Sequence, residues 1–351
     1  MNASQRVLAA CQFQEPDQIP RFDSFWEYPR DWEETFGPVE NLSDIAIWVP
    51  NETTFPTRAN LIKEENGIIY EIEDWGRLIR RRKDAYFSEV LQVPIPPGCD
   101  PEKVVFDSPN LDSRFLMGKS NLEDTDRLLQ RTRQQQCVFG KTGGPFLRST
   151  FVRGEAQFLI DMAADPVLAR VIAEKVTDHL IAIGLQEISR WNLQDTGIWI
   201  YDDMAANQGP MFSPRSFEKI LLPSYRKMIH AYKQAGAKYV FLHSDGNINL
   251  LMDMLVDAGI NGINPLERRA GMDPFQLRKR YPELILTGGM DNTGTLIRGP
   301  EERIRQEAKE LIDLGRDGGL VIGTHSISPE IPLQHFKAYH DFVQTYGNFS
   351  M

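Results

Sequence analysis

The sequence predicts a (β/α)8 TIM barrel with an irregular N-terminal extension, and three observations support this prediction. From about residue 121 onward, short apolar runs alternate with helical patterns, as expected for parallel βαβ units. These runs are apolar on both faces, which is typical of strands buried between a core and a helix layer. No glycine-rich phosphate-binding loop opens a helix, which favours a barrel over an open nucleotide-binding sheet.

The length and composition fit one enzyme-sized domain. The 351 residues are 41% hydrophobic, so we expect a single barrel domain over 1–351, irregular in 1–120 and regular in 121–351. A net charge of −10 argues against nucleic acid as the main partner. The basic run Arg80–Lys83 indicates either an anion site or a solvated face. No membrane-spanning run and no signal peptide are recognisable, so a cytoplasmic location is expected.

The elements are predicted in chain order from periodicity and capping residues. The irregular part indicates a strand at 19–25 and a hairpin around 68–74. A helix at 121–135, a strand at 137–140, the loop KTGGP and two helical segments, 154–164 and 165–192, follow. Asp165 is a plausible N-cap, with Pro166 at the first helical position. The remaining strands are expected at 197–203, 238–245, 259–267, 283–292 and 319–326, with helices near 213–235, 247–258, 273–281 and 300–315. The eighth strand is expected within the irregular first third.

Polar residues end five successive strand runs. In a (β/α)8 barrel the carboxyl ends of all strands meet at one mouth, whatever their separation in sequence. These positions therefore predict a functional mouth, although a single polar strand end is commonly just a solvent contact or a helix cap. They are Asp202, Asp203, His243, Ser244, Asp245, Asn264, Glu267, Asp291, Asn292, Thr324, His325 and Ser326.

Four of these residues form a candidate metal-binding set. His243 and Asp245 are two apart on an extended segment and so point to the same face. Glu267 follows the next strand, and His325 follows the last strand, which neighbours the first in a closed barrel. Two imidazoles with one or two carboxylates suit zinc or another divalent ion. The alternative is a hydrogen-bonded polar cluster that holds no metal.

Several segments resemble the uroporphyrinogen decarboxylase superfamily. They are GGPFLRSTFVRGEAQFLIDMAADP (143–166), IYDDMAANQGPMFSPRSFEKILLPSYRKMI (200–229), FLHSDGNINLLMDMLVDAGINGINPLE (241–267), ILTGGMDN (285–292) and GLVIGTHSISPEIPLQHFKAY (319–339). The resemblance covers more than half of the chain and implies one of two chemistries. One is cofactor-free decarboxylation of porphyrinogens, and the other is zinc-dependent methyl transfer involving a corrinoid protein.

The decarboxylase alternative fits the N-terminal part poorly. The family's arginine-rich signature is replaced by RFDSFWEYPRDWEE (21–34), without its paired arginine spacing, and Phe151 stands where the family has an active-site tyrosine. Asp44 is a weak match to the decarboxylase aspartate, and His325 matches a family histidine. Decarboxylation of uroporphyrinogen III or a related carboxylate would use the cationic groups Arg21, Arg148, Arg153 and His325, with Asp202 or Asp44 near the pyrroles.

The methyltransferase resemblance fits the middle and end of the chain. The related enzymes have a zinc motif H-x-C, a later cysteine and a glutamate between them. His243 and Glu267 agree with that pattern, while Asp245 and His325 replace the cysteines. Each replacement still binds zinc, so the resemblance implies the metal ligands His243, Asp245, Glu267 and His325. The loss of two thiolates makes the site harder and favours an oxygen atom on the substrate.

The resemblance also implies roles and partners. Glu267 is expected as a displaceable ligand or base, and His325 as a ligand near the reacting atoms. Asp202 and Asp203 are expected to orient the substrate or to support the imidazoles. The chain has no corrinoid-binding DxHxxG motif, so a separate protein would supply the corrinoid, alongside a small-molecule methyl donor or acceptor. A homodimer is common in the superfamily. A barrel that only binds a ligand is the non-enzymatic alternative.

Overall fold

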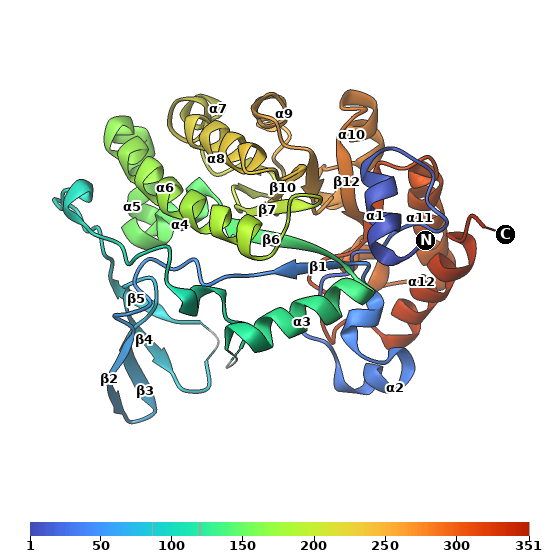
Figure 1. The fold of residues 1–351 in the computed structure, drawn as a ribbon, viewed down its shortest axis with the longest axis horizontal. Coiled ribbons are helices and arrows are strands. Elements are labelled where there is room, and N and C mark those ends of the chain that lie inside the picture. Colours follow the sequence, from blue (N-terminus) through green and yellow to red (C-terminus); the bar gives the residue numbers. More distant parts are fainter. Residues whose placement is uncertain (86, 119–120, 351) are drawn as a thin grey trace.

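The computed structural model describes residues 1–85, 87–118 and 121–350. Across these residues, seven parallel strands form one curled sheet at the centre of the molecule, with helices packed around it (Figure 1). In sheet order the strands are β1 (Ile45–Trp48), β6 (Cys137–Gly143), β7 (Gly197–Tyr201), β10 (Tyr239–His243), β11 (Gly262–Asn264), β12 (Ile285–Gly289) and β13 (Leu320–Gly323).

Residues 20–25 take the eighth strand position and close the sheet into a barrel. On one side the Phe22 N–H donates to the Ile322 oxygen of β13 at 2.8 Å. On the other side the Asp44 N–H, just before β1, donates to the Arg21 oxygen at 2.8 Å. The predicted (β/α)8 barrel is therefore confirmed, and β1 is the strand that the irregular first third was expected to contain.

The barrel interior is filled by large aromatic side chains from alternate strand positions. Trp199 and Phe241 stack with ring centroids 4.9 Å apart, and Phe22 and Phe139 pack against them. Helix α1 (Ala3–Cys11) closes the amino end of the barrel, where its buried side chains join the same cluster. The interior is thus a packed core, and only the carboxyl end of the barrel is left for a site.

The outer layer consists of helices that follow the strands. Asp165 caps α6 by accepting from the Leu168 N–H at 3.1 Å, as predicted. None of the described helices combines the length and apolar character that crossing a bilayer requires. The helices are α3 (Leu122–Gln135), α4 (Pro145–Arg153), α5 (Glu155–Ala164), α6 (Pro166–Arg190), α7 (Pro214–Ser216), α8 (Leu222–Gln234), α9 (Met252–Ala258), α10 (Pro274–Arg280), α11 (Glu301–Gly315) and α12 (Leu333–Tyr346), with π-helical turns η5 (Phe217–Leu221) and η7 (Asn292–Leu296).

The N-terminal extension contains more structure than the expected hairpin. A four-stranded antiparallel sheet stands apart from the barrel strands, at the lower left of Figure 1. It comprises β2 (Asn60–Glu65), β3 (Ile68–Ile72), β4 (Leu78–Arg82) and β5 (Glu89–Gln92). The remaining described elements are the short helix α2 (Glu33–Phe36), the two-residue strands β8 (Ala205–Ala206) and β9 (Gly209–Pro210), and the 3-10 turns η1 (Arg30–Trp32), η2 (Val39–Leu42), η3 (Pro101–Lys103), η4 (Asp112–Phe115) and η6 (Arg268–Ala270).

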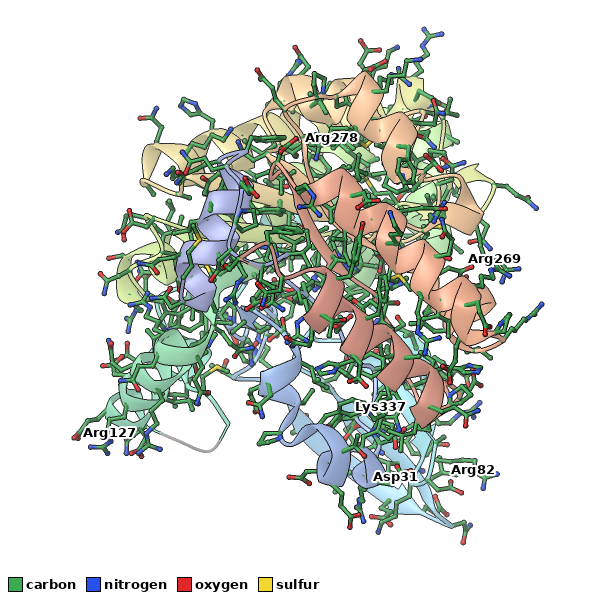
Figure 2. All side chains as sticks on the ribbon, turned by 90° about the vertical axis from the view of Figure 1, so that its right-hand side faces the viewer. Asp31, Arg82, Arg127, Arg269, Arg278 and Lys337 are labelled. Carbon is green, nitrogen blue, oxygen red and sulfur yellow. The ribbon has the colours of Figure 1, made fainter. Side chains whose placement is uncertain are left out.

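The basic run lies on β4 and is neutralised by nearby acids. Each of its four cations forms an ion pair with a carboxylate of the extension, and Figure 2 shows Arg82 at the outer edge of the molecule. The run is therefore a solvated, charge-paired face. The pairs are Arg80–Glu89, Arg81–Glu71, Arg82–Asp84 and Lys83–Glu64.

Asp202, at the end of β7, points outward to the helix layer. Its carboxylate accepts from the Phe146 and Leu147 N–H groups at the start of α4, at 3.0 and 2.6 Å, and from the Tyr225 hydroxyl. The side chain is fully buried, and burial raises the pKa of Asp202 to about 6. A Cβ on Gly144 would lie 2.3 Å from this side chain, so glycine is required there. The structure corrects the expectation that Asp202 faces the mouth, because it anchors α4 instead.

This role predicts different effects for two adjacent aspartates. Asp202→Ala leaves three buried donors without their acceptor, and we expect it to lower the free energy of unfolding by roughly 2–5 kcal/mol. Asp203→Ala, at a side chain that is 43% exposed, serves as the matched control and should cost less than about 1 kcal/mol. Urea denaturation of both variants measures the difference. Equal stability of the two would contradict the anchoring role.

Candidate active site

The side chains at the mouth follow the two-residue alternation of the barrel strands. Trp199 lies in the interior core, so Tyr201 and Asp203 continue the inward face of β7. Phe241 also lies in the interior core, so His243 and Asp245 continue the inward face of β10. The local geometry thus separates inward groups, available for chemistry, from outward groups that pack under helices.

Two imidazoles and two carboxylates converge, as the sequence predicted for His243, Asp245, Glu267 and His325. Asp245 Oδ1 lies 3.6 Å from His243 Nε2 and 3.5 Å from His325 Nε2. Glu267 Oε1 lies 3.6 Å from His325 Nε2. Four groups that span 83 residue positions of the chain therefore meet in one place, because the curled sheet brings the ends of β10, β11 and β13 together.

Asp203 joins the cluster from the neighbouring strand. Its Oδ1 lies 3.9 Å from His243 Nε2 and accepts from the Asp245 N–H at 3.0 Å. The donors form two overlapping triads that share Asp245: Asp203–His243–Asp245 and Asp245–Glu267–His325. Asp203 is thus placed where it can support the imidazole, as expected, and it is also a possible metal donor.

Neighbouring groups hold the donors in position. His243 Nδ1 lies 2.7 Å from Asn264 Oδ1, which leaves Nε2 directed at the carboxylates. The imidazole also stacks on the Tyr201 ring at a centroid distance of 4.2 Å. The second Glu267 oxygen accepts from the Gly246 N–H. These contacts pre-orient the cluster before any ligand arrives.

The cluster has the properties of a cation site. Asp245 Oδ1 is buried and has no hydrogen-bond partner among the described residues, which is costly for a carboxylate. Two donors of a tetrahedral zinc ion, each about 2.0–2.1 Å from it, are roughly 3.3–3.4 Å apart. The distances of 3.5–3.6 Å around Asp245 Oδ1 are close to that separation, whereas the cluster as a whole is wider and divides into two triads that share Asp245. The donor types and the spacing within each triad therefore fit a divalent cation.

Burial shifts the protonation of the two central groups. Burial lowers the pKa of His243, although Asp245 and Asn264 act in the opposite direction. The imidazole is therefore neutral at pH 7, and its lone pair is available to a metal. Burial also raises the pKa of Asp245, against the effect of the two imidazoles. A bound cation would offset this cost by stabilising the carboxylate.

A small pocket adjoins His325 and Glu267. It lies between the ends of β11, β12 and β13, and Ser326, next to His325, adopts a left-handed φ of 54° that turns the chain at this point. Polar groups line the pocket, which has room for about one water molecule or a small polar group. They include Arg268, Arg269, Asp291, Asn292, Thr293 and Thr324.

Sequence reasoning missed two inward residues of the mouth, Lys141 and Tyr201. Lys141 was expected in a loop, but β6 extends to Gly143, so Lys141 continues the inward face set by Cys137 and Phe139. Tyr201 precedes the aspartates of β7 and was treated as part of the strand. The alternation of inward side chains is the signal that identifies both.

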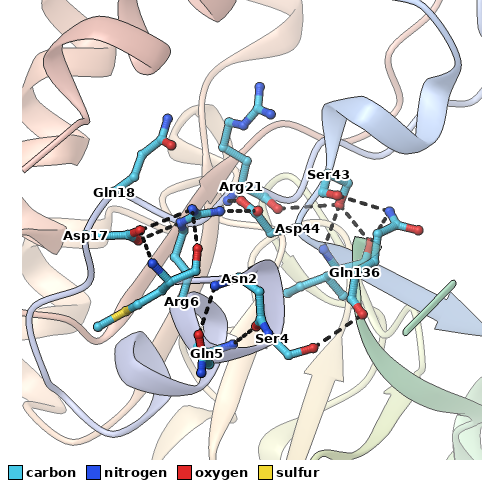
Figure 3. A network of polar contacts seen from close by, with 12 residues as sticks. Asn2, Ser4, Gln5, Arg6, Asp17, Gln18, Arg21, Ser43, Asp44 and Gln136 are labelled. Atoms are coloured by element: carbon cyan, nitrogen blue, oxygen red, sulfur yellow. Dashed lines mark hydrogen bonds and ion pairs between the residues drawn. The ribbon is translucent and has the colours of Figure 1, made fainter. Parts of the chain in front are cut away.

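Most residues of the decarboxylase alternative lie elsewhere, although Arg148 pairs with Glu52 beside the mouth. Asp44 is at the amino end of β1, where it accepts from Arg6 Nη1 and from the Arg21 N–H, each at 2.8 Å (Figure 3). The Arg21 guanidinium donates to the Asn41 oxygen, and Arg153 pairs with Asp161 in a buried contact. Phe151 packs on the Trp75 ring. These residues do not form one cluster with His325.

Comparisons with known proteins agree with this fold. A model of the uroporphyrinogen decarboxylase (URO-D) family matches residues 116–346. A methylcobamide:CoM methyltransferase of Methanosarcina acetivorans is 24% identical over 216 residues, covering 61% of this chain and 60% of the relative. Another from Methanosarcina barkeri is 27% identical over 129 residues, covering 36% of each chain. The chain therefore matches less than two thirds of the length of these curated relatives.

The fold is shared with a solved methyltransferase from Methanosarcina mazei, at a TM-score of 0.68 and 17% identity over 99% of both chains. The family match spans about two thirds of the sequence, and it contains His243 at the end of β10, Glu267 after β11 and His325 after β13. This chain belongs to the uroporphyrinogen decarboxylase family.

Proposed function

We propose that this chain is a metal-dependent methyltransferase that moves a methyl group between a small O-methyl or S-methyl substrate and a corrinoid protein. The observation that carries the proposal is the unpartnered Asp245 Oδ1, held 3.5–3.6 Å from the Nε2 atoms of His243 and His325. The names of the two Methanosarcina relatives, which describe methyl transfer involving a methylcobamide and CoM, support the reaction class.

The residues of the mouth have distinct roles in this proposal. His243, Asp245 and His325 hold a divalent cation, zinc in the simplest case, and Glu267 is a fourth donor that substrate can displace. When bound, the cation supplies Lewis-acid stabilisation of negative charge on the heteroatom that loses or gains the methyl group. Asn264 fixes the His243 ring, and Asp203 supports the same imidazole.

The donor set favours oxygen over sulfur on the substrate. The cluster offers only nitrogen and oxygen ligands, because Asp245 and His325 occupy the positions of the two cysteines in the related zinc motif. Harder donors make the cation harder, and a harder cation prefers an alkoxide or phenoxide to a thiolate. We therefore place a methyl ether or a methanol-like compound ahead of a thioether.

Partners and the alternative activity follow from the same geometry. The corrinoid would come on a separate protein that presents it at the open end of the barrel, and a homodimer remains an expectation. Decarboxylation has less support, since Asp44 lies at the amino end of the barrel and Arg153 is paired with Asp161. The cluster at the mouth would have no evident use in a cofactor-free reaction.

The first prediction concerns metal content. Protein purified without added zinc should contain about one divalent ion per chain, measured by plasma mass spectrometry. His243→Ala or His325→Ala should abolish stable binding, because each removes a donor. Asn264→Ala should weaken the affinity by roughly 10–100-fold, because it only releases the imidazole.

His230→Ala is the matched control, since His230 is exposed on α8. It should leave the metal content unchanged. An apoprotein that also fails to take up zinc, cobalt or manganese in dialysis would contradict the metal-dependent mechanism.

The second prediction concerns the choice of heteroatom. The double variant D245C/H325C replaces a carboxylate and an imidazole by thiols, which softens the site. The ratio of O-methyl to S-methyl turnover should fall relative to the natural chain. Methylcobalamin formation from cob(I)alamin, with methoxybenzene derivatives and their methylthio counterparts as donors, measures this ratio.

Cob(I)alamin stands in for the corrinoid protein in this assay. The single variants D245C and H325C should give intermediate ratios if each donor acts on the same cation. An unchanged ratio in the double variant, with zinc retained, would contradict the role given to the donor set.

A further inference from the structure

Lys141 places a cation inside the mouth, close to the donor cluster. It lies on β6, two residues after the interior Phe139, and its side chain is only 16% exposed. Its Nζ atom lies 5.1 Å from the centroid of the Tyr201 ring on the neighbouring strand β7. That ring stacks on His243 of β10. The ammonium and the imidazole are thus on the two strands that flank β7.

The carboxylate closest to the Lys141 ammonium, that of Glu52, does not accept a hydrogen bond from it. Glu52 Oε1 is 3.7 Å from Lys141 Nζ, which is too long for a hydrogen bond. The same oxygen already accepts from Arg148 Nε at 2.7 Å, and Glu52 Oε2 accepts from the Gly143 N–H. Burial alone would raise the pKa of Glu52, but the Arg148 and Lys141 cations hold it below its usual value. The carboxylate is fully engaged.

This wall of the mouth therefore carries an excess positive charge. Two cations, Lys141 and Arg148, face the carboxylate of Glu52. The other nearby carboxyl, Glu187, accepts from the Lys141 backbone N–H at 2.9 Å, and its complete burial raises its pKa well above the usual value. Arg148 forms an ion pair with the Glu52 carboxylate and also lies over the rings of Trp75 and Phe151. Within the described residues, Lys141 Nζ donates no hydrogen bond, and its ion pair with Glu52 spans 3.7 Å, so its three N–H donors are available to a ligand. An anion beside Lys141 would accept from these donors.

We propose that Lys141 binds the anionic end of the substrate, a carboxylate or sulfonate, while the heteroatom at the other end reaches the donor cluster. This assignment rests on the proposed function, because it takes the cluster as the reacting end. The intervening Tyr201 ring sets the spacing: the substrate spans about one aromatic ring between its anion and its heteroatom. Lys141 is a specificity-determining residue that contacts the end of the substrate that does not react.

Equilibrium binding tests the assignment with three probes of one shape. 4-Methoxybenzoate and 4-methoxybenzenesulfonate carry the anion, and methoxybenzene lacks it. Calorimetry on both zinc-loaded and chelator-treated protein should show at least about 10-fold tighter binding of one anionic probe than of methoxybenzene. The two anionic probes distinguish a carboxylate pocket from a sulfonate pocket. The preference should disappear in Lys141→Met and persist in Lys141→Arg.

Lys238→Met is the matched control. Lys238 also lies over a tyrosine ring, at 5.6 Å from Tyr239, but at the amino end of β10. It should keep the full preference for the anionic probe. Equal affinities for anionic and neutral probes in the natural chain, or an unchanged preference in Lys141→Met, would overturn the assignment.

The binding and methyl-transfer results separate the two proposals. A Lys141-dependent preference without any demethylation of the probes would support the anion site while the methyltransferase proposal fails. Methyl transfer from methoxybenzene and 4-methoxybenzoate with equal KM values, unaffected by Lys141→Met, would overturn the anion site while the methyltransferase proposal stands.

Discussion

The hydrogen bonds that residues 20–25 make to both β13 and the start of β1 determine the architecture of this protein. They turn an open parallel sheet into a closed barrel, in which the last strand lies beside the first. His325 follows that last strand, whereas His243 ends a strand in the middle of the sheet. The curvature of the sheet brings both imidazoles to within 3.6 Å of the same carboxylate oxygen. The stacked aromatic rings below them fill the interior and leave the mouth as the one open end of the barrel.

The second constraint is the alternation of side chains along each strand. A shift of one position along a strand changes whether a side chain faces the mouth or the helix layer, as Asp202 and Asp203 demonstrate. The same rule directs Lys141, Tyr201 and His243 inward from three neighbouring strands, so a cation, an aromatic ring and a donor cluster stand in sequence around the mouth. Polar groups buried in this manner are costly individually. The proposed ion and anion would together offset this cost.

The alternation of strands and helices and the polar strand ends were sufficient to predict the barrel and the meeting of His243, Asp245, Glu267 and His325. The sequence did not show which residues at the end of β7 face inward, because a shift of one position reverses which aspartate faces the mouth. Lys141 was not predicted as a residue of the mouth, because the glycines that follow it indicate a loop. The antiparallel sheet of the extension was recognised only at β3, since β2 and β5 are exposed along their whole length and lack the apolar alternation that identifies a strand.

The unpartnered oxygen of Asp245 also has a consequence for the folded state as a whole. The groups around it come from the ends of four different strands, so an ion placed among them would join distant parts of the chain, whereas the unfolded chain offers no such arrangement. Resistance to unfolding then depends on the free concentration of the ion, rising by about 1.4 kcal/mol for each tenfold excess over its dissociation constant. A cell poor in that ion would thus hold less of the intact enzyme, in addition to less of the active form.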